Sequence, residues 1–87
     1  MIVLTSKNYD KKSGKLDKKV RSALLNRLAI FLNDPFSPIL NNHPLSGARR
    51  HQRSINITGD WRLIFEQVDD TTVRLLDVDT HHNLYGS

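Results

Sequence analysis

Cysteine is absent from this 87-residue chain, and its absence removes two ways of holding a small protein together. Without thiols the fold has neither a disulfide framework nor a thiolate metal site, so an apolar core must stabilise it. The lack of cysteine also fits a reducing cytosol, and we expect a cytoplasmic protein. A chain of this length has room for one core, which predicts a single domain over residues 1–87.

Long apolar runs are missing as well. The longest apolar stretch lies within LLNRLAIFL, residues 24–32, where asparagine and arginine interrupt it. It is far shorter than the roughly 20 residues that a membrane-spanning helix needs. The first residues, MIVLTSKNYDKK, turn basic too soon to resemble a signal peptide. We therefore expect a soluble protein that does not contact a membrane.

Acidic residues are scarce in the N-terminal part of the chain. Residues 1–27 hold eight Lys or Arg against two Asp, a net charge of +6. Residues 60–80 reverse the balance, with six acids against two Arg, a net charge of −4 in a chain of +4. A basic half beside a more acidic half indicates a surface that faces a polyanion. Solubilising lysines on helices would give the same pattern, so charge alone does not decide between the two.

Apolar periodicity predicts the element order β-α-α-β-β-β. A short strand at residues 2–5 precedes a short helix that begins after Ser6 and breaks near Ser13-Gly14. A longer helix follows over residues 16–33, and the three last strands lie within residues 53–58, 61–68 and 72–80. This order predicts an α+β domain in which two N-terminal helices pack on a small, mainly antiparallel four-stranded sheet.

Two sets of apolar residues are expected to pack. The long helix carries a stripe at i, i+4 spacing, widened by two further residues: Leu16, Val20, Leu24, Leu28 and Leu32, with Leu25 and Phe31. The connector at residues 34–51 contains all three prolines and is long enough to be functional or disordered. Its apolar residues favour a packed loop: Phe36, Ile39, Leu40 and Leu45. The last residues, HHNLYGS, predict a terminal turn or a single helical turn.

Four histidines raise the question of a metal site: His43, His51, His81 and His82. His81 and His82 are adjacent, so on a strand their side chains would point to opposite faces. The sequence has no HExxH motif and no paired Cys/His motif, and Asp77 and Asp79 could join a site only through the fold. We expect no physiological metal site.

Three segments of the C-terminal half resemble one known family when they are taken together. They are HPLSG at residues 43–47, GDWRLIF at residues 59–65 and THHNLYG at residues 80–86. Their order and spacing are similar to those of the RelE/ParE superfamily of toxin ribonucleases, most of all to its YafQ-like branch. The N-terminal half matches only in its pattern of elements. The resemblance implies the β-α-α-β-β-β fold and the toxin component of a type II toxin-antitoxin system.

The resemblance also implies an activity and partners. The expected activity is ribosome-dependent cleavage of translated mRNA, which inhibits translation and growth. The expected partners are a cognate antitoxin, the ribosome and mRNA, with DNA contacted only through the antitoxin and no cofactor. In such enzymes the ribose 2′-OH attacks the adjacent phosphate without a metal, so the site must supply a base, an acid and a cation.

Four residues match catalytic positions of this family. His81 is expected to act as the general acid that protonates the 5′ leaving oxygen, although it could be an exposed terminal histidine. Asp60 and His43 are expected to be a base and its orienter, in either order, although an aspartate is also a common turn residue. Arg62 matches an arginine by which related branches stabilise phosphoryl charge.

Further residues are expected to contact the substrate. Tyr85 matches an aromatic position that stacks on a base, and Trp61 either stacks on a base or caps the core. Arg53 is a second candidate for a phosphate contact. Asn56 stands where the family often has a histidine, so it can orient a group but cannot transfer a proton. The N-terminal lysines are expected to contact ribosomal RNA: Lys7, Lys11, Lys12, Lys15, Lys18 and Lys19.

Other functions stay open on the sequence alone. A ParE-like toxin that poisons a topoisomerase and cleaves no RNA would not need the set of His43, Asp60 and His81. A non-toxic basic module would bind RNA without altering it. Asn56 in place of a histidine leaves room for a catalytically weak member of the fold.

Overall fold

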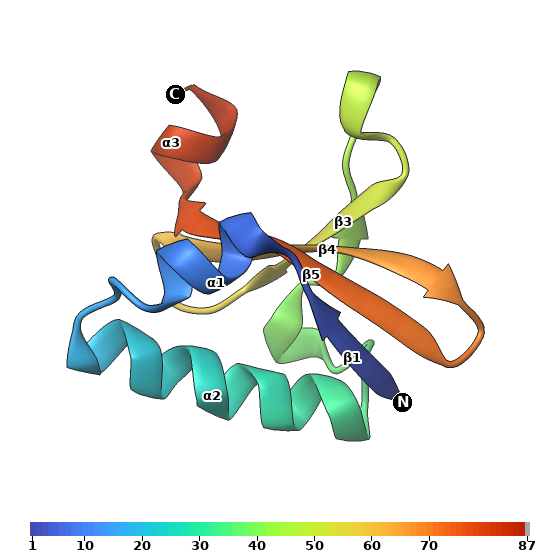
Figure 1. Ribbon diagram of the computed structural model, residues 1–87, viewed down its shortest axis with the longest axis horizontal. Coiled ribbons are helices and arrows are strands. Elements are labelled where there is room, and N and C mark those ends of the chain that lie inside the picture. Colours follow the sequence, from blue (N-terminus) through green and yellow to red (C-terminus); the bar gives the residue numbers. More distant parts are fainter. Residues whose placement is uncertain (87) are drawn as a thin grey trace.

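A five-stranded mixed sheet forms the centre of the fold, and the computed structural model describes it within residues 1–86 (Figure 1). The strands are β1 (Ile2–Thr5), β2 (His43–Pro44), β3 (Gln52–Asn56), β4 (Trp61–Asp69) and β5 (Thr72–Thr80). They lie in the order β1-β5-β4-β3-β2, in which β1 runs parallel to β5 and the other neighbours are antiparallel. The predicted α+β class with a mainly antiparallel sheet is confirmed.

The sheet has one strand more than the predicted four, so that part of the prediction is wrong. The additional strand is β2, which lies inside the expected connector and pairs His43 with Ser54 and Pro44 with Arg53. The Leu45 amide continues the pairing by donating to the Gln52 carbonyl at 2.9 Å. A strand of two residues, one of them proline, has no alternation for a sequence pattern to reveal. The rest of the connector contains two short 3-10 helices, η1 (Pro38–Leu40) and η2 (Gly47–Arg49).

The ends of the helices follow from their cap residues. Helix α1 (Lys7–Ser13) begins after Ser6, whose side chain accepts a hydrogen bond from the Tyr9 amide, as predicted. Helix α2 (Lys18–Asn33) begins after Asp17, which accepts from the Val20 amide at 2.9 Å, and not at Leu16 as predicted. The expected terminal turn is a third helix, α3 (His81–Tyr85). Within residues 1–86 no helix is both long and apolar enough to cross a membrane.

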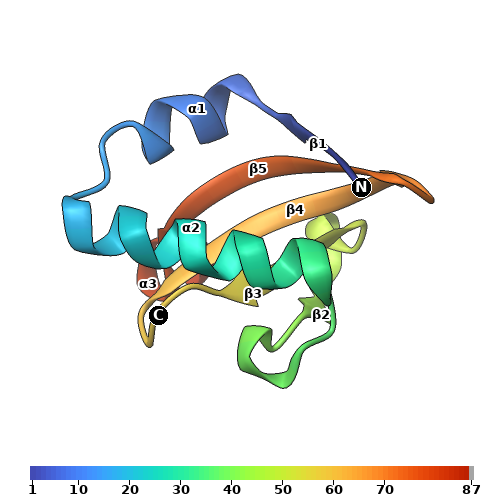
Figure 2. The ribbon, with the colours of Figure 1, turned by 90° about the horizontal axis from the view of Figure 1, so that it is seen from below.

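Helix α2 covers one face of the sheet and fills the core from that side (Figure 2). Phe31 meets Phe65 of β4 edge-on, with ring centroids 4.8 Å apart. Two leucines of the predicted stripe are exposed instead, Leu25 by 62% and Leu32 by 47%. An α-helix advances about 100° per residue, so a stripe that also buries Leu24 and Phe31 leaves these two at its edges.

The four apolar residues of the connector differ in burial, and Leu45 is half-buried. Leu40 is completely buried and belongs to the core, as predicted. Phe36 and Ile39 are exposed by 69% and 50%, so the prediction that they pack inward is wrong. One buried leucine and the pairing of β2 with β3 are enough to hold the segment against the sheet.

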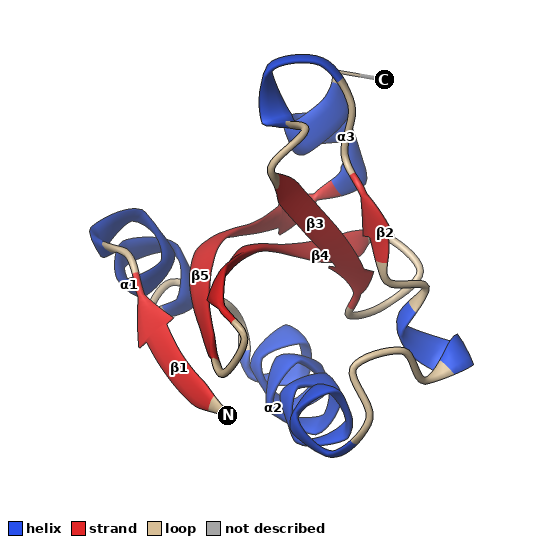
Figure 3. Ribbon diagram, turned by 90° about the vertical axis from the view of Figure 1, so that its right-hand side faces the viewer, coloured by secondary structure: helices blue, strands red, loops and turns tan. Residues whose placement is uncertain are grey.

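The other face of the sheet stays uncovered by α2. Helix α3 and the β2–β3 connection both project from this side, as two views at right angles show (Figures 1 and 3). Side chains alternate between the faces of a strand, so residues paired directly across two strands share a face. The pairs His43–Ser54, Asn56–Arg62 and Arg62–Asp79 therefore put mostly polar side chains on the face opposite the core.

Leu24 and Leu25 offer a matched test of this packing, because they are neighbours on α2 with 2% and 62% exposure. Leu24→Ala should lower the free energy of unfolding by about 2–5 kcal/mol through lost burial and a residual cavity. Leu25→Ala should change it by less than about 0.5 kcal/mol. Urea unfolding followed by circular dichroism measures both. Equal losses in the two variants would contradict the orientation of α2.

Candidate active site

Two of the predicted catalytic residues line one open cavity, although 38 positions of sequence separate His43 from His81. The cavity has a volume of about 430 Å³. Strand β2 and the residues after it form one wall, and α3 forms the other with His81 and Tyr85. Thus the HPLSG and THHNLYG segments, which the sequence analysis paired by resemblance, meet in the fold.

A hydrogen bond of His43 determines which of its two ring nitrogens carries the proton in the neutral form. Its Nδ1 lies 2.7 Å from the Asn41 carbonyl oxygen. A carbonyl oxygen can only accept, so Nδ1 carries the proton and donates it. In the neutral ring this leaves Nε2 with a lone pair, which is the form that a general base requires.

His81 begins α3 and is exposed to solvent. Its backbone N–H donates to the Asp60 carbonyl at 2.7 Å, which fastens the start of α3 to the β3–β4 turn. Its ring meets the Tyr85 ring edge-on, with centroids 4.6 Å apart. The His81 imidazole is thus exposed, and it is held by its backbone and by one aromatic neighbour.

Asp60 lies beside His81 through this backbone contact. Its own N–H donates to Thr58 Oγ1 at 3.2 Å, as expected of a turn residue. Its side chain is exposed, and among the described residues its carboxylate accepts no hydrogen bond. Asp60 thus acts as a turn residue, as one of its two predicted roles requires. Its carboxylate stays free beside the residue that begins α3.

Arg62 is occupied by the same turn. Its guanidinium donates to the carbonyl oxygens of Thr58 at 2.9 Å, Trp61 at 3.0 Å and Gly59 at 3.3 Å. The side chain is half-buried. In this arrangement the arginine satisfies the carbonyls of the corner and does not point freely into solvent.

Trp61 and Asn56 lie next to the corner. Trp61 is half-buried and packs against the core, which favours the second of its two predicted roles. It also borders a small cavity of about 170 Å³ with Lys12, Leu16 and Asp79. Asn56 is paired with Arg62 across the strands, and its buried Oδ1 accepts no hydrogen bond within the described residues.

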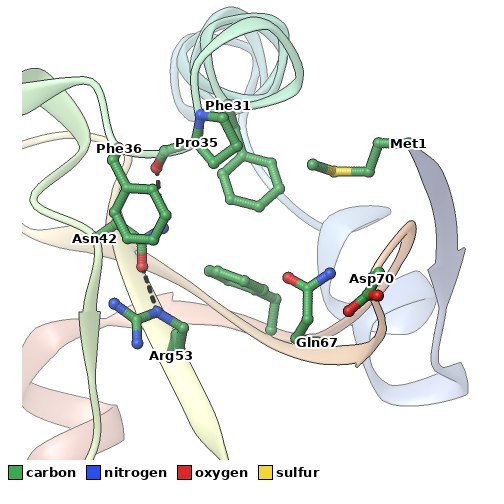
Figure 4. A pocket seen from close by; sticks show the side chains of 9 residues that line it. Met1, Phe31, Pro35, Phe36, Asn42, Arg53, Gln67 and Asp70 are labelled. Carbon is green, nitrogen blue, oxygen red and sulfur yellow. Dashed lines mark hydrogen bonds between the residues drawn. The ribbon is translucent and has the colours of Figure 1, made fainter.

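Arg53 is not brought to the histidines. It alternates with Ser54, so its side chain lies on the other face of β3 from that of His43. Its Nε donates to Asn42 Oδ1 at 2.8 Å, and its guanidinium carbon lies 5.5 Å from the centroid of the Phe36 ring (Figure 4). It borders a separate cavity of about 290 Å³ that also contains Phe31 and Met1.

The basic residues of the N-terminal half divide into two groups. Lys11, Lys18 and Lys19 are exposed. Lys12 instead binds Asp77 Oδ1 at 2.7 Å and Asp79 Oδ2 at 2.9 Å. Burial acts to lower the pKa of Lys12, but the two carboxylates outweigh it and raise the pKa above its usual value.

Asp79 has a structural role that its sequence context did not indicate, where it was considered only as a possible metal ligand. Burial acts to raise its pKa, but hydrogen bonds from Lys12, Asn83 and Thr80 outweigh this and lower the pKa. The spacing of Asp77 and Asp79, two apart on a strand, was the available signal for a shared cation. Nothing in the pattern showed that the cation would be Lys12. Within residues 1–86 no three His, Asp or Glu side chains are grouped so that they could hold a metal ion.

Comparison with known proteins finds the same fold in several bacterial toxins. YafQ from E. coli strain BL21(DE3) superposes with a TM-score of 0.78, at 24% identity over 97% of each chain. The YoeB/ParE toxin from Agrobacterium tumefaciens gives a TM-score of 0.77 at 14% identity, over 93% of this chain and 99% of that one. A chain of the E. coli DinJ-YafQ toxin-antitoxin complex gives 0.68 at 26% identity, over 97% of this chain and 96% of that one.

The sequence comparisons are of two kinds. No curated protein matches the chain. The model of a family described as bacterial toxin of type II toxin-antitoxin system, YafQ, matches residues 4–86. Because that match spans nearly the whole chain, the protein belongs to the YafQ family of type II toxins.

Proposed function

We propose that this toxin is an endoribonuclease that cuts mRNA on the translating ribosome. The observation that carries the proposal is the cavity that His43 and His81 line from opposite walls. Two histidines on either side of one open space can take up a proton and release one in a single reaction. The YafQ family and its RelE/ParE relatives support the same activity.

The proposed reaction is a transfer within the RNA. His43 Nε2 takes the proton of the ribose 2′-OH, and the 2′ oxygen forms a bond to the adjacent phosphorus. The bond from phosphorus to the 5′ oxygen breaks, and protonated His81 gives its proton to that oxygen. The products are a 2′,3′-cyclic phosphate and a 5′-hydroxyl end, and the two imidazoles supply both proton transfers.

The residues of the corner have supporting roles in this scheme. Asp60, whose carbonyl binds the His81 amide, orients a catalytic histidine with its free carboxylate. Arg62 stabilises phosphoryl charge only after it leaves the turn carbonyls that it now binds, and until then it holds the corner. Tyr85 offers its ring to a base, and Asn56 orients the substrate through its amide. Arg53 has no role in this scheme, because its side chain lies on the other face of β3 and borders a different cavity.

The proposal includes the partners of the toxin. A cognate antitoxin would neutralise it and would carry any contact with DNA, as the DinJ-YafQ toxin-antitoxin complex suggests for a relative. The substrate is mRNA in the ribosome, so the toxin would act in the cytoplasm without a cofactor. The exposed lysines Lys11, Lys18 and Lys19 would bind ribosomal RNA.

Expression in a bacterium tests the function as a whole. Induction should arrest growth and produce new 5′-hydroxyl ends within open reading frames, because cleavage leaves the oxygen of the downstream nucleotide protonated. Sequencing of 5′ ends beside a growth curve measures both. Intact mRNA together with stalled replication would instead support a ParE-like topoisomerase poison, and RNA binding without cleavage or arrest would support a plain binding module.

His81 and His82 provide a matched pair for the acid assignment, because both are exposed and adjacent on α3. His81→Ala should lower the single-turnover cleavage rate by about 10²–10⁴-fold, the range of one general acid or base. His82→Ala should leave the rate close to that of the parent. The free energy of unfolding of both variants should lie within about 0.5 kcal/mol of that of the parent. Equal rates in the two variants would rule out His81 as the acid.

Salt dependence tests the ribosome contact. Replacing Lys11, Lys18 and Lys19 by glutamine should weaken binding to ribosomes and flatten its dependence on salt. Each lost phosphate contact removes about 0.7–0.9 from the slope of log K against log salt. Arg74→Gln is the control, because its guanidinium is already bound to Glu66 at 2.7 Å. An unchanged slope in the triple variant would place the contact elsewhere on the protein.

A further inference from the structure

The helix that carries His81 and Tyr85 has little to hold it in place. Helix α3 has five residues, and none of them is buried. So short a helix is not stable in water on its own. The position of His81 therefore depends on the contacts made at the start of α3.

The Asp79 side chain makes two of these contacts, beside the backbone bond from His81 to Asp60. Its Oδ1 accepts from the Thr80 backbone N–H at 2.7 Å and from Asn83 Nδ2 at 2.8 Å. Thr80 in turn caps the helix, since its Oγ1 accepts from the Asn83 backbone N–H at 3.2 Å. Asp79 thus binds the side chain of Asn83, and Thr80 binds its backbone N–H. Asn83 lies two residues after His81, in the first turn of α3.

Lys12 sets the orientation of this carboxylate. It donates to Asp79 Oδ2 at 2.9 Å, which leaves Oδ1 turned toward α3. The lysine is itself held by Asp77 at 2.7 Å and by its place in α1. Both carboxylates have less than a fifth of their side-chain surface exposed, so solvent weakens these ion pairs less than it weakens pairs on the open surface.

We propose that Asp79, oriented by Lys12, is a positioning residue that fixes α3 and thereby sets His81 against the cavity it shares with His43. The inference rests on the proposed function of His81 as the general acid. It links α1 to the catalytic helix through a chain of three side chains, Lys12, Asp79 and Asn83. It also removes Lys12 from the ribosome-binding lysines, since its ammonium is committed to the two carboxylates.

Single-turnover kinetics on programmed ribosomes, run beside a binding titration, test the assignment. Asp79→Ala should lower the cleavage rate by about 10- to 100-fold, the scale of a catalytic group displaced by up to about 1 Å. Ribosome affinity should stay the same or rise, because the variant removes a negative charge. Asp79→Asn should recover part of the rate, because it keeps an oxygen for the α3 donors and loses only the attraction to Lys12.

Asp77→Asn is the matched control, because Asp77 binds the same lysine but has no contact with α3. It should cut at close to the parental rate. A loss as large as that of Asp79→Ala would overturn the positioning role in favour of a general charge effect. Parental cleavage by Asp79→Ala would overturn it directly, and so would a loss of rate that only follows a loss of ribosome affinity.

Hydrogen exchange of the free protein gives a readout that does not depend on activity. In Asp79→Ala and in Lys12→Ala, the backbone amides of His81 and Asn83 should exchange at least about 10-fold faster, and the contact between the His81 and Tyr85 rings should weaken in NMR spectra. In Asp77→Asn they should match the parent. Unchanged exchange in Asp79→Ala would refute the inference. If the parent itself cut no RNA, the proposed function would fail, and this measurement would still decide whether Asp79 fixes α3.

Discussion

Burial of a single face of the sheet under α2 is the constraint on which the rest of the molecule depends. Phe31 of α2 packs edge-on against Phe65 of β4, and Val20 and Leu24 of the same helix belong to the same apolar cluster. Successive side chains of a strand point to opposite faces of the sheet. Apolar residues can therefore fill the face under α2 while polar residues occupy the other face. His43, Arg62 of the corner and the acids of β5 belong to that second side. A helix on both faces would have left no room for a site in so small a chain.

The corner GDWRLIF takes part in three different interactions, two of which use side chains and one of which uses the backbone. Trp61 turns toward the core, Arg62 binds the carbonyls of the turn, and the Asp60 carbonyl receives the His81 amide at 2.7 Å. The corner is thus the anchor of α3 as well as the start of β4. The tryptophan and the arginine of the corner therefore have structural roles, whereas the Asp60 carboxylate has none among the described residues and is left to the proposed function.

Much of this fold could be predicted from the sequence, and the misses have physical causes. Caps and alternation are local signals, so Ser6 as a cap and the span of β5 were predictable. Strand β2 was not, because its two residues pair only through tertiary contact. The motifs paired His43 with His81, and both line one cavity. Arg53 borders a different cavity, which the sequence did not indicate because the face of β3 to which a side chain points depends on register. The ion pairs of Lys12 with Asp77 and Asp79 were not predictable either, since charge counts do not reveal which acid lies beside which base.

Most acids of residues 60–80 are either paired with a cation or distant from the histidines. A net charge of −4 over residues 60–80 should repel RNA from the very segment that holds the site. Three of those acids are paired with cations, Asp77 and Asp79 with Lys12 and Glu66 with Arg74. Asp69 and Asp70 lie at the β4–β5 turn, the end of the sheet away from α3 (Figure 1). Among the described residues, Asp60 is then the acid of this segment that lies beside His81 without a cation partner, so its carboxylate stays available to the site.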